Sequence, residues 1–424
     1  MEKSGLPYLS FVVIKDGKCF VNGERHFVFD IPKLASIRAI GDLLISFCGE
    51  HDIDYIGEDT AVKCVREAYN STRALKAQTK EDNGNGKENK KKSEDALELV
   101  KAKCNELFTD QYTKPYAVIR VNSHAETLSL QSQKFRNWIA KLYYDAHGGT
   151  LSSEDITSTL NVLKAEAQFN GPQRQLDVRV VSMPGDNSTI YYDLTNPEWQ
   201  CITITPDGWS VQAAPVVFTR YANHKAQVYP VKDYPADILD QFLKFLNVKD
   251  EDHKLLLKCY LISLFIPNIA KPALMPYGPQ GSAKSTLQEL IKMVVDPSVT
   301  PTLSFPKDST ELMQKLAHNY IAYFDNVSTI YDWISDDLCK AVTGSGFSKR
   351  ALYTDDDDDI YSFKRCIGFN GINLGATKGD LLDRGLIIQL ERIPREKQRK
   401  QTDIWAEFEA IRPQLLGLIM DTLV

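Results

Sequence analysis

Closely spaced cysteines are missing from this sequence. Its eight cysteines are scattered over 424 residues and form no Cys-x-x-Cys pair. Zinc sites and disulfide-rich folds need cysteines at short, paired spacings, so the pattern argues against both and indicates reduced thiols in a cytoplasm. The N-terminus also lacks a charged-then-apolar leader, so nothing there predicts export. We therefore expect a cytoplasmic protein.

Long hydrophobic runs are missing as well. The longest strongly apolar run, Leu255–Ile266, contains Lys258 and is shorter than the roughly 20 residues needed to cross a bilayer. We therefore expect a buried helix there and no contact with a membrane. The hydrophobic share of 43% and the charged share of 25% are those of an ordinary soluble globular protein. The length gives room for roughly two or three domains.

An excess of positive charge is the third missing feature. The 50 Lys+Arg residues are outnumbered by 56 Asp+Glu residues, and the formal net charge is −6. The whole chain therefore exerts no general attraction on nucleic acid. Such contact must come from a local basic surface or a lined channel, and composition alone leaves the function open.

The segment 76–95, KAQTKEDNGNGKENKKKSED, has almost no apolar residue. It cannot offset its ordering entropy by burial, so we expect a flexible linker. Its KENKKK run is expected to be solvated rather than to bind nucleic acid. Residues 1–75 precede it, with an alternating stretch around Val13 and a predicted helix near Leu43–Phe47. Their pattern indicates no role.

Residues 96–221 predict a small α+β accessory domain that serves DNA or a partner, because no catalytic cluster is found in them. A helix begins at Ser93 and carries an apolar series that continues to Leu107. The helix that follows Ser152 opens with a capping box completed by Asp155. The predicted strands are Tyr116–Val121, Leu176–Val181, Thr189–Asp193 and Gln200–Thr205, and the other predicted helices are Gln133–Asp145 and Ser153–Ala167.

Residues 232–395 predict an α/β fold. Two apolar helices, Asp237–Leu246 and Asp252–Phe265, come first, and strand-like and helix-like segments then alternate. That alternation is typical of a parallel sheet flanked by helices. Residues 401–424 predict an amphipathic helix that ends on an apolar face, which indicates a truncated sequence or an interface.

The stretch GPQGSAKST, which begins at Gly278, predicts a phosphate-binding loop. A strand-like segment, Pro272–Tyr277, precedes it, although Pro276 predicts that this strand ends early. A helical segment follows, and main-chain N–H groups at the start of a helix surround phosphates well. Lys284 would place its charge at the β/γ position, and the Ser285 hydroxyl would complete a Mg²⁺ shell. The alternative is a glycine-rich turn that merely precedes a helix.

The predicted nucleotide contacts of this loop are Gly278, Pro279, Gln280, Gly281, Ser282, Ala283, Lys284, Ser285 and Thr286. Ala283 stands where the common pattern has glycine. If that position needs a left-handed backbone, alanine costs about 1–2 kcal/mol that glycine avoids. Because the two glycines remain, the turn is still possible and the loop is not disqualified.

A phosphate loop predicts a second element, an apolar strand that ends in an acid. IAYFDN, which begins at Ile321, places Asp325 at such a strand end as a Mg²⁺ ligand, with Asn326 beside it as a further catalytic candidate. The alternative is a buried strand that happens to end in Asp-Asn. A later strand, CIGFNG, ends in Asn370, which can orient the attacking water. The Asn-Gly pair is also a turn signal, and Asn373 is the alternative for the water-orienting role.

Arg384 opens a further apolar strand. An arginine there can reach the γ-phosphate of a neighbouring subunit and stabilise developing charge. The alternative is a surface salt bridge with Asp383 or Asp380.

Five ordered motifs then resemble a known group. They are GPQGSAKS at Gly278, DNVS at Asp325, VTGSGFSKRALYTDD at Val342, NGIN at Asn370 and LLDRG at Leu381. From about Val231 to Val424 the chain resembles the superfamily-3 helicase type of AAA+ ATPase found in phage, plasmid and virus primase-helicases. It resembles more closely a family of mobile-element ATP-binding proteins, in which the alanine before the lysine is ordinary. Leu107–Tyr221 also resembles the domain that precedes the ATPase there.

The resemblance implies a homo-oligomeric ring, expected to be hexameric, with ATP and Mg²⁺ between subunits. Lys284, Ser285, Asp325 and Asn370 would act in one subunit and Arg384 would come from the next. It also implies movement along DNA, expected to be single-stranded, with a primase or replication partner. A β-hairpin between the acid strand and the Asn370 strand would carry the nucleic-acid contacts, and the candidates are Lys349, Arg350, Lys364 and Arg365.

The predicted hairpin turn departs from this expectation. Its sequence is DDDDD, Asp355–Asp359, and carboxylates repel phosphate. Either the basic residues of the arms make the contact, or the hairpin does not touch DNA.

The first function that we expect is therefore an ATP-dependent motor, a helicase acting on DNA in mobile-element or phage replication. The second is a non-motor ATPase switch that controls assembly or the release of a partner. The third is a small-molecule kinase. This function has less support, because the sequence contains no lid-like arginine cluster.

Overall fold

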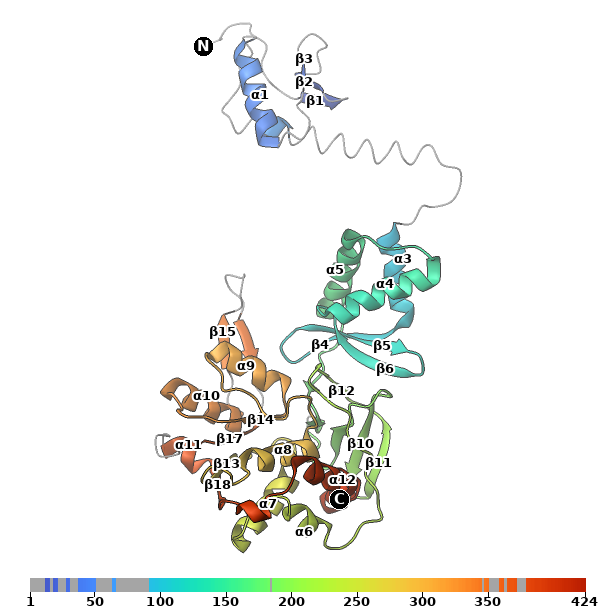
Figure 1. The fold of residues 1–424 in the computed structure, drawn as a ribbon. Helices are drawn as coiled ribbons and strands as arrows, with labels where there is room; N and C mark the ends of the chain where they lie inside the picture. The colour runs from blue at the N-terminus through green and yellow to red at the C-terminus, as the bar shows by residue number, and fades with distance from the viewer. Residues whose placement is uncertain are drawn as a thin grey trace. The chain divides into compact units, whose positions relative to one another are not determined.

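The computed structural model describes residues 12–15, 18–21, 28–30, 37–50, 63–65, 91–183, 185–344, 347–350, 358–361, 364–371 and 379–424. The chain divides into two compact units, Met1–Lys90 and Lys91–Val424 (Figure 1). Each unit has its own secondary structure and core. In the described part of the chain, no helix combines the length and the hydrophobicity that a membrane span requires.

The first unit contains a three-stranded antiparallel sheet and a helix. The sheet consists of β1 (Val12–Lys15), β2 (Lys18–Val21) and β3 (Val28–Asp30), and α1 (Ile37–Glu50) contains the helix predicted near Leu43–Phe47. Cys19 and Cys48 are buried, and burial raises the pKa of the Cys19 thiol to about 12. A thiol with so high a pKa stays protonated and packs as a small apolar group.

The second unit begins earlier than the sequence predicts. α3 (Lys92–Lys103), with Lys91 as its N-cap, starts inside the segment predicted as a linker, so the linker bound at residue 95 is corrected to 90. Residues 76–90 lie outside the described residues. The apolar series that predicted a helix as far as Leu107 changes element at Cys104, where β4 (Cys104–Thr109) begins. Cys104 and Leu107, the last residues of that series, lie in this strand. The prediction was wrong because two apolar residues three positions apart do not distinguish the end of a helix from the start of a strand.

A three-stranded antiparallel sheet follows α3. It is built from β4, β5 (Pro115–Val121) and β6 (His124–Ser129). Two further helices, α4 (Gln133–His147) and α5 (Ser153–Phe169), pack with α3 around a common core. The predicted capping box of α5 is confirmed, since Ser152 and Asp155 exchange both hydrogen bonds.

A second sheet has the order β11-β10-β9-β8. The strands are β8 (Val180–Val181), β9 (Ile190–Asp193), β10 (Gln200–Thr205) and β11 (Gly208–Ala213), and β7 (Leu176–Asp177) pairs separately with β12 (Val217–Phe218). The single strand predicted for Leu176–Val181 is therefore wrong. Arg179 has a left-handed backbone (φ 63°), which breaks the extended run between β7 and β8.

The α/β part is confirmed as a parallel sheet flanked by helices, in the order β14-β17-β13-β18. Its elements after the leading helices α6 (Ile238–Leu243) and α7 (Glu251–Ser263) are β13 (Ala273–Tyr277), α8 (Lys284–Val295), α9 (Ser309–His318), β14 (Ile321–Phe324), α10 (Asp332–Thr343), β15 (Phe347–Arg350), β16 (Asp358–Tyr361), β17 (Cys366–Phe369), α11 (Gly379–Asp383), β18 (Gly385–Gln389), η2 (Arg395–Lys397) and α12 (Gln401–Leu423). Pro276 does not end β13, because it stands opposite Ile388 within the ladder.

The predicted boundary between an accessory domain and the α/β domain is not a break in packing. One buried cluster contains residues of β9, α7, α8 and α12. For example, the rings of Tyr192 and Phe265 lie 5.1 Å apart. The strands β8–β11 therefore share their core with the parallel sheet, although the sequence places them in separate regions.

Candidate active site

The loop between β13 and α8 has the backbone that phosphate binding needs. Gly278 has φ 154°, and a Cβ there would lie 2.2 Å from the Leu390 carbonyl oxygen. Gly281 also has a positive φ, of 80°. Ala283 caps α8 in the left-handed region, with φ 65° and ψ 35°. The left-handed position considered from the sequence is therefore present, and the alanine there carries the strain that glycine would avoid.

Lys284 extends along the inside of this loop. Its Nζ donates to the carbonyl oxygens of Gly278 (2.9 Å) and Pro279 (3.0 Å) and lies 3.5 Å from Ser282 Oγ. Burial lowers the pKa of the ammonium group, and the charge of Asp325 opposes that shift. Loop carbonyl oxygens therefore hold this ammonium group near the amino end of α8. The main-chain N–H groups at the same helix end favour a negatively charged ligand.

The predicted metal ligands meet at the start of α8. Ser285 Oγ donates to Asp325 Oδ1 at 2.8 Å. The strand order explains the contact, because β14 and β13 both end at the carboxyl edge of the sheet and β17 lies between them. Hydroxyl and carboxylate oxygens suit Mg²⁺, which keeps several waters and takes one or two protein ligands. No group of three or more His, Cys, Asp or Glu in the described ranges could hold a metal by itself.

Asn370 joins the same cluster from the end of β17. Its Oδ1 accepts from the Asn326 main-chain N–H at 3.0 Å, and its Nδ2 donates to Gln288 Oε1 at 2.8 Å. The same Nδ2 lies 3.5 Å from Ser285 Oγ. Asn326 takes part through its backbone, with φ 55°. The structure thus brings Lys284, Ser285, Asp325, Asn326 and Asn370 together, whereas Asn373 lies outside the described residues.

A cavity of about 620 Å³ lies next to the loop. Hydrogen bonds connect the residues around this cavity to the loop. Asn247 donates to the carbonyl oxygens of Ser282 (3.0 Å) and Glu391 (2.8 Å), and Ile393 N–H donates to Gly281 O at 3.1 Å. Its lining contains no residue of 278–286, and Asn247 provides the link to the loop. Apolar, cationic and acidic side chains line it, among them Leu243, Val248, Ile404, Lys244, Lys249, Arg392, Lys397, Asp240, Glu251 and Glu391. Sequence reasoning missed this cavity because three separate segments form it.

Arg384 lies at the other end of the sheet from its own loop. Its carbonyl oxygen accepts from Ala273 N–H (2.8 Å) at the start of β13, whereas the loop follows the end of that strand. The guanidinium forms an ion pair with Asp380 and also donates to the Asp380 carbonyl oxygen. The salt bridge weighed as an alternative is therefore present in the isolated chain.

A hairpin is present as the antiparallel pair β15 and β16, but Asp358 and Asp359 belong to β16 and not to the predicted turn. The strand register places Lys349 opposite Asp359 and Arg350 opposite Asp358. Two acidic residues therefore belong to the hairpin strands together with the two basic candidates. Asp355, Asp356 and Asp357 lie outside the described residues.

Two basic residues predicted to bind nucleic acid lie just before β17. Arg365 is only 7% exposed, and its Nε donates to the Leu316 carbonyl oxygen at 2.8 Å. The Arg365 guanidinium is therefore buried inside the protein. The prediction that Arg365 contacts nucleic acid is corrected. Lys364 donates to the Asn268 carbonyl oxygen at 2.6 Å and is partly exposed.

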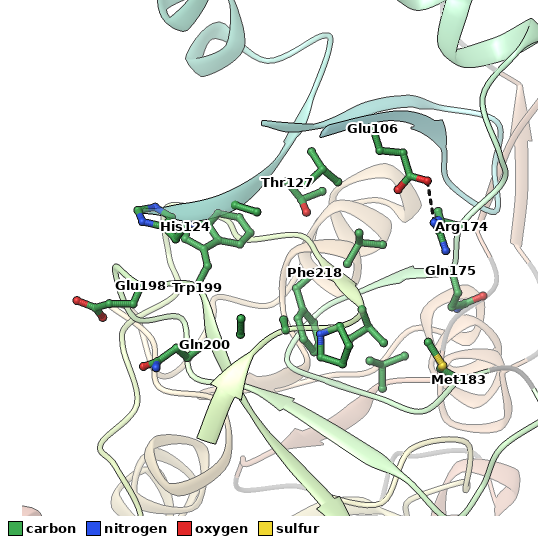
Figure 2. Close-up of a pocket in the computed structure, with 18 of the residues that line it drawn as sticks. Glu106, His124, Thr127, Arg174, Gln175, Met183, Glu198, Trp199, Gln200 and Phe218 are labelled. Atoms are coloured by element: carbon green, nitrogen blue, oxygen red, sulfur yellow. Dashed lines mark hydrogen bonds and ion pairs between the residues drawn. The ribbon is translucent and has the colours of Figure 1, made fainter. Parts of the chain in front are cut away.

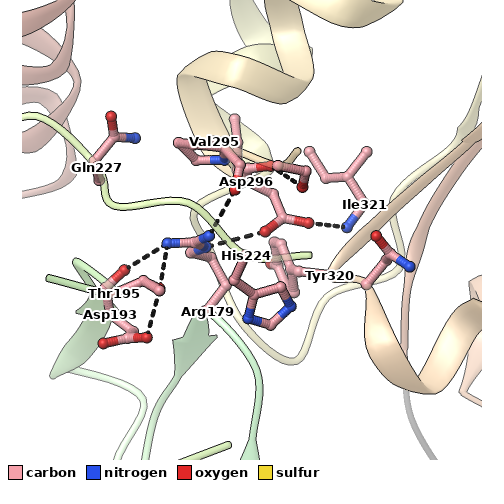
Figure 3. Close-up of polar contacts among 12 residues, drawn as sticks. Arg179, Asp193, Thr195, His224, Gln227, Val295, Asp296, Tyr320 and Ile321 are labelled. Carbon is pink, nitrogen blue, oxygen red and sulfur yellow. Dashed lines mark hydrogen bonds and ion pairs between the residues drawn. The ribbon is translucent and has the colours of Figure 1, made fainter. Parts of the chain in front are cut away.

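A buried charge cluster holds the far end of α8 (Figure 3). Arg179 Nε donates to Asp296 Oδ1 at 3.0 Å, and both side chains are fully buried. Asp296 Oδ2 also accepts from Ile321 N–H at 3.0 Å and lies 3.3 Å from Lys292 Nζ. Burial would raise the pKa of Asp296, but Lys292 and Arg179 outweigh it and hold that pKa well below its usual range. One carboxylate thus ties α8 to β14 and to the second sheet.

A larger cavity, of about 680 Å³, lies between β4–β6 and the segment around β12 (Figure 2). Glu106 and Arg174, which form an ion pair at 2.7 Å, lie at one side of it, and Trp199 and Phe218 are among its apolar lining residues. Its lining includes no residue of the phosphate loop. It is therefore a separate feature from the candidate active site.

One comparison with known proteins, a family model, concerns replication. Residues 239–424, which include the loop and all four strands of the parallel sheet, match the model of the family described as Actinomycete integrative conjugative element replication protein. A search of curated protein sequences gave no match.

Two solved structures illustrate the weaker structural likenesses. The apo NrS-1 C-terminal region has 14% identity and a TM-score of 0.44, over 77% of this chain and 69% of that one. The JCV helicase has 14% identity and a TM-score of 0.28, over 45% of this chain and 55% of that one. At these scores the likenesses identify no function. The C-terminal region is thus similar, through the family model, to replication proteins of integrative conjugative elements.

Proposed function

We propose that this protein is an ATP-dependent motor of the superfamily-3 helicase type that acts on DNA during replication of a mobile element. The observation that carries the proposal is the 2.8 Å contact between Ser285 and Asp325 at the start of α8. It joins the loop hydroxyl to an acid-tipped strand, as a Mg²⁺–nucleotide site requires. The family-model match supports the replication context.

Each residue of the candidate active site has a separate role in the proposed phosphoryl transfer. The loop N–H groups and Lys284 would bind the phosphates, with the ammonium exchanging its carbonyl partners for phosphate oxygens. Ser285 and Asp325 would hold Mg²⁺, which when bound offsets negative charge on the phosphates. Asn370 would orient water with its amide. The apolar side chains of the 620 Å³ cavity, which Asn247 links to the loop, would suit a base, and its polar side chains would suit a ribose.

Arg384 fits a role toward a second subunit in a homo-oligomeric ring. Its position at the amino end of the sheet separates it from the loop of its own chain. Arginine stabilises the charge that develops during phosphoryl transfer. Contact with single-stranded DNA is assigned to Lys349, Arg350 and Lys364, without Arg365.

Replacing Asp325 by Asn should weaken catalysis that depends on Mg²⁺. The neutral amide keeps the shape but loses the charge that attracts the cation, so we expect kcat to fall on the order of 100-fold and the Mg²⁺ requirement to rise. A Mg²⁺ titration of ATP hydrolysis measures both. Asp207→Asn, in an exposed turn, is the matched control. An unchanged titration curve for Asp325→Asn would count against the metal assignment.

Replacing Arg384 by Ala should leave nucleotide binding intact and lower hydrolysis by about 10³-fold, the lower end of the effect of an arginine that acts in trans. Asp380→Ala is the matched control, because it breaks the same ion pair and leaves the guanidinium in place. Mixing Arg384→Ala with Lys284→Ala subunits should restore part of the activity, since some interfaces then contain both groups. Equal losses in Arg384→Ala and Asp380→Ala would instead assign Arg384 to local structure.

A non-motor ATPase switch is the second candidate. The two acidic residues Asp358 and Asp359, which the strand register places opposite Arg350 and Lys349, favour it, because carboxylates repel the phosphates of DNA. A strand-displacement assay, with Lys284→Ala as the inactive control, separates the two functions. The motor predicts hydrolysis stimulated by single-stranded DNA together with unwinding. The switch predicts hydrolysis that does not respond to DNA.

A further inference from the structure

Gln288 is a polar residue at a fully buried position of α8. It is 0% exposed and comes one turn after Ser285, so it lies on a neighbouring position of the same helix face. Its Oε1 accepts one hydrogen bond, from Asn370 Nδ2 at 2.8 Å. Its Nε2 has no hydrogen-bond partner in the described part of the chain. A buried amide donor without a partner costs free energy, so stability alone does not account for a glutamine here.

The hydrogen bonds define which way the Asn370 amide faces. The Asn326 main-chain N–H can only donate, so the Asn370 atom 3.0 Å from it must be the oxygen. The Asn370 nitrogen therefore faces Gln288, and the atom of Gln288 that meets it must also be an oxygen. The unpartnered Gln288 nitrogen follows from the same logic. Gln288 is the acceptor that keeps the Asn370 N–H₂ group on the side of Ser285, 3.5 Å from its hydroxyl.

We propose that Gln288 is a positioning residue that fixes the Asn370 amide as a hydrogen-bond donor toward the reacting phosphate and water. The inference rests on the proposed ATPase function and adds a residue that no motif of the sequence indicates. Gln288 acts only through Asn370. Without it, the Asn370 amide keeps only the Asn326 N–H and the longer contact to Ser285 Oγ, while the loop proposed to bind the nucleotide keeps its own contacts.

The test compares kcat with KM in Gln288→Leu and Gln288→Met. Both variants replace the amide, with its acceptor Oε1, by an apolar side chain of similar volume. We expect kcat to fall by about 10-fold or more, because small displacements of a positioning group cost rate. KM and nucleotide affinity should stay within about 2-fold. Gln227→Leu is the matched control: Gln227 is also buried and donates to Tyr192 Oη and Val294 O, outside the active-site cluster. It should lower the unfolding temperature and leave kcat unchanged.

A double variant decides whether Gln288 works through Asn370. Asn370→Ala and Asn370→Ala/Gln288→Met should have the same kcat, because nothing remains to be positioned. Multiplied losses in the double variant, or wild-type kcat in both Gln288 single variants, would overturn the proposal. A wild-type protein without ATP hydrolysis would overturn the proposed function and the proposal with it. Active wild-type protein with unaffected Gln288 variants would overturn the proposal alone.

Discussion

Lys284→Ala is expected to abolish nucleotide turnover, with a loss of about 100-fold or more in kcat/KM. Lys284 supplies the one ammonium group that lies inside the described loop, held there by the Gly278 and Pro279 carbonyl oxygens. Alanine leaves the loop N–H groups but removes the point charge at the β/γ position. Release of inorganic phosphate from ATP, measured at saturating Mg²⁺, gives the result directly.

The control for this variant separates charge from folding. Lys103→Ala removes an exposed lysine at the end of α3 and should keep wild-type turnover. The unfolding transition of Lys284→Ala should stay close to that of the wild type, because its ammonium contacts only loop groups and is half-buried. Full turnover in Lys284→Ala would refute the assignment of the loop.

Asp296→Ala is expected to lower the free energy of unfolding by about 3–5 kcal/mol. The substitution leaves Arg179 and Lys292 as buried cations without their shared carboxylate. It also removes the acceptor of the Ile321 N–H at the start of β14. Urea unfolding measures the change.

The pH dependence of this effect has a defined sign. The folded-state pKa of Asp296 lies below that of the unfolded chain, so the carboxylate contributes stability above about pH 4, the unfolded pKa. That contribution is lost as the pH falls toward the folded pKa. The difference between wild type and Asp296→Ala should therefore be largest near neutral pH and shrink in acid.

Asp240→Ala provides the matched comparison for Asp296→Ala. Its pair with Lys258 is partly exposed, and such pairs contribute about 0–1 kcal/mol. A loss in Asp296→Ala no larger than in Asp240→Ala would show that the buried cluster does not anchor α8.

The sequence predicted the α/β architecture and the loop because both depend on short-range patterns. Strand, loop and helix follow one another between Pro272 and Val295, and the apolar runs that end in Asp325 and Asn370 mark two strand tips. Spacing along the chain does not state which strands are neighbours. The position of β17 between β14 and β13 explains why Asn370 bonds to Asn326 and Gln288.

Long-range contacts account for what the sequence did not reveal. Arg179 lies in what looks like one continuous strand, and its partner Asp296 is far away in the chain. Arg365 follows Lys364 in a basic pair, yet a main-chain oxygen of α9 holds its guanidinium in the interior. Composition and periodicity describe a residue's chemistry and neighbours in sequence, and they do not report which groups the fold buries together.

Equilibrium binding of a fluorescent ATP analogue, with and without Mg²⁺, tests the central claim most directly. A phosphate site formed by the loop, Lys284, Ser285 and Asp325 predicts saturable binding that Mg²⁺ strengthens. Lys284→Ala should weaken that binding, Lys103→Ala should leave it unchanged, and unlabelled ATP should displace the analogue. Absence of saturable binding to the wild-type protein in the presence of Mg²⁺ would contradict the motor and the switch together.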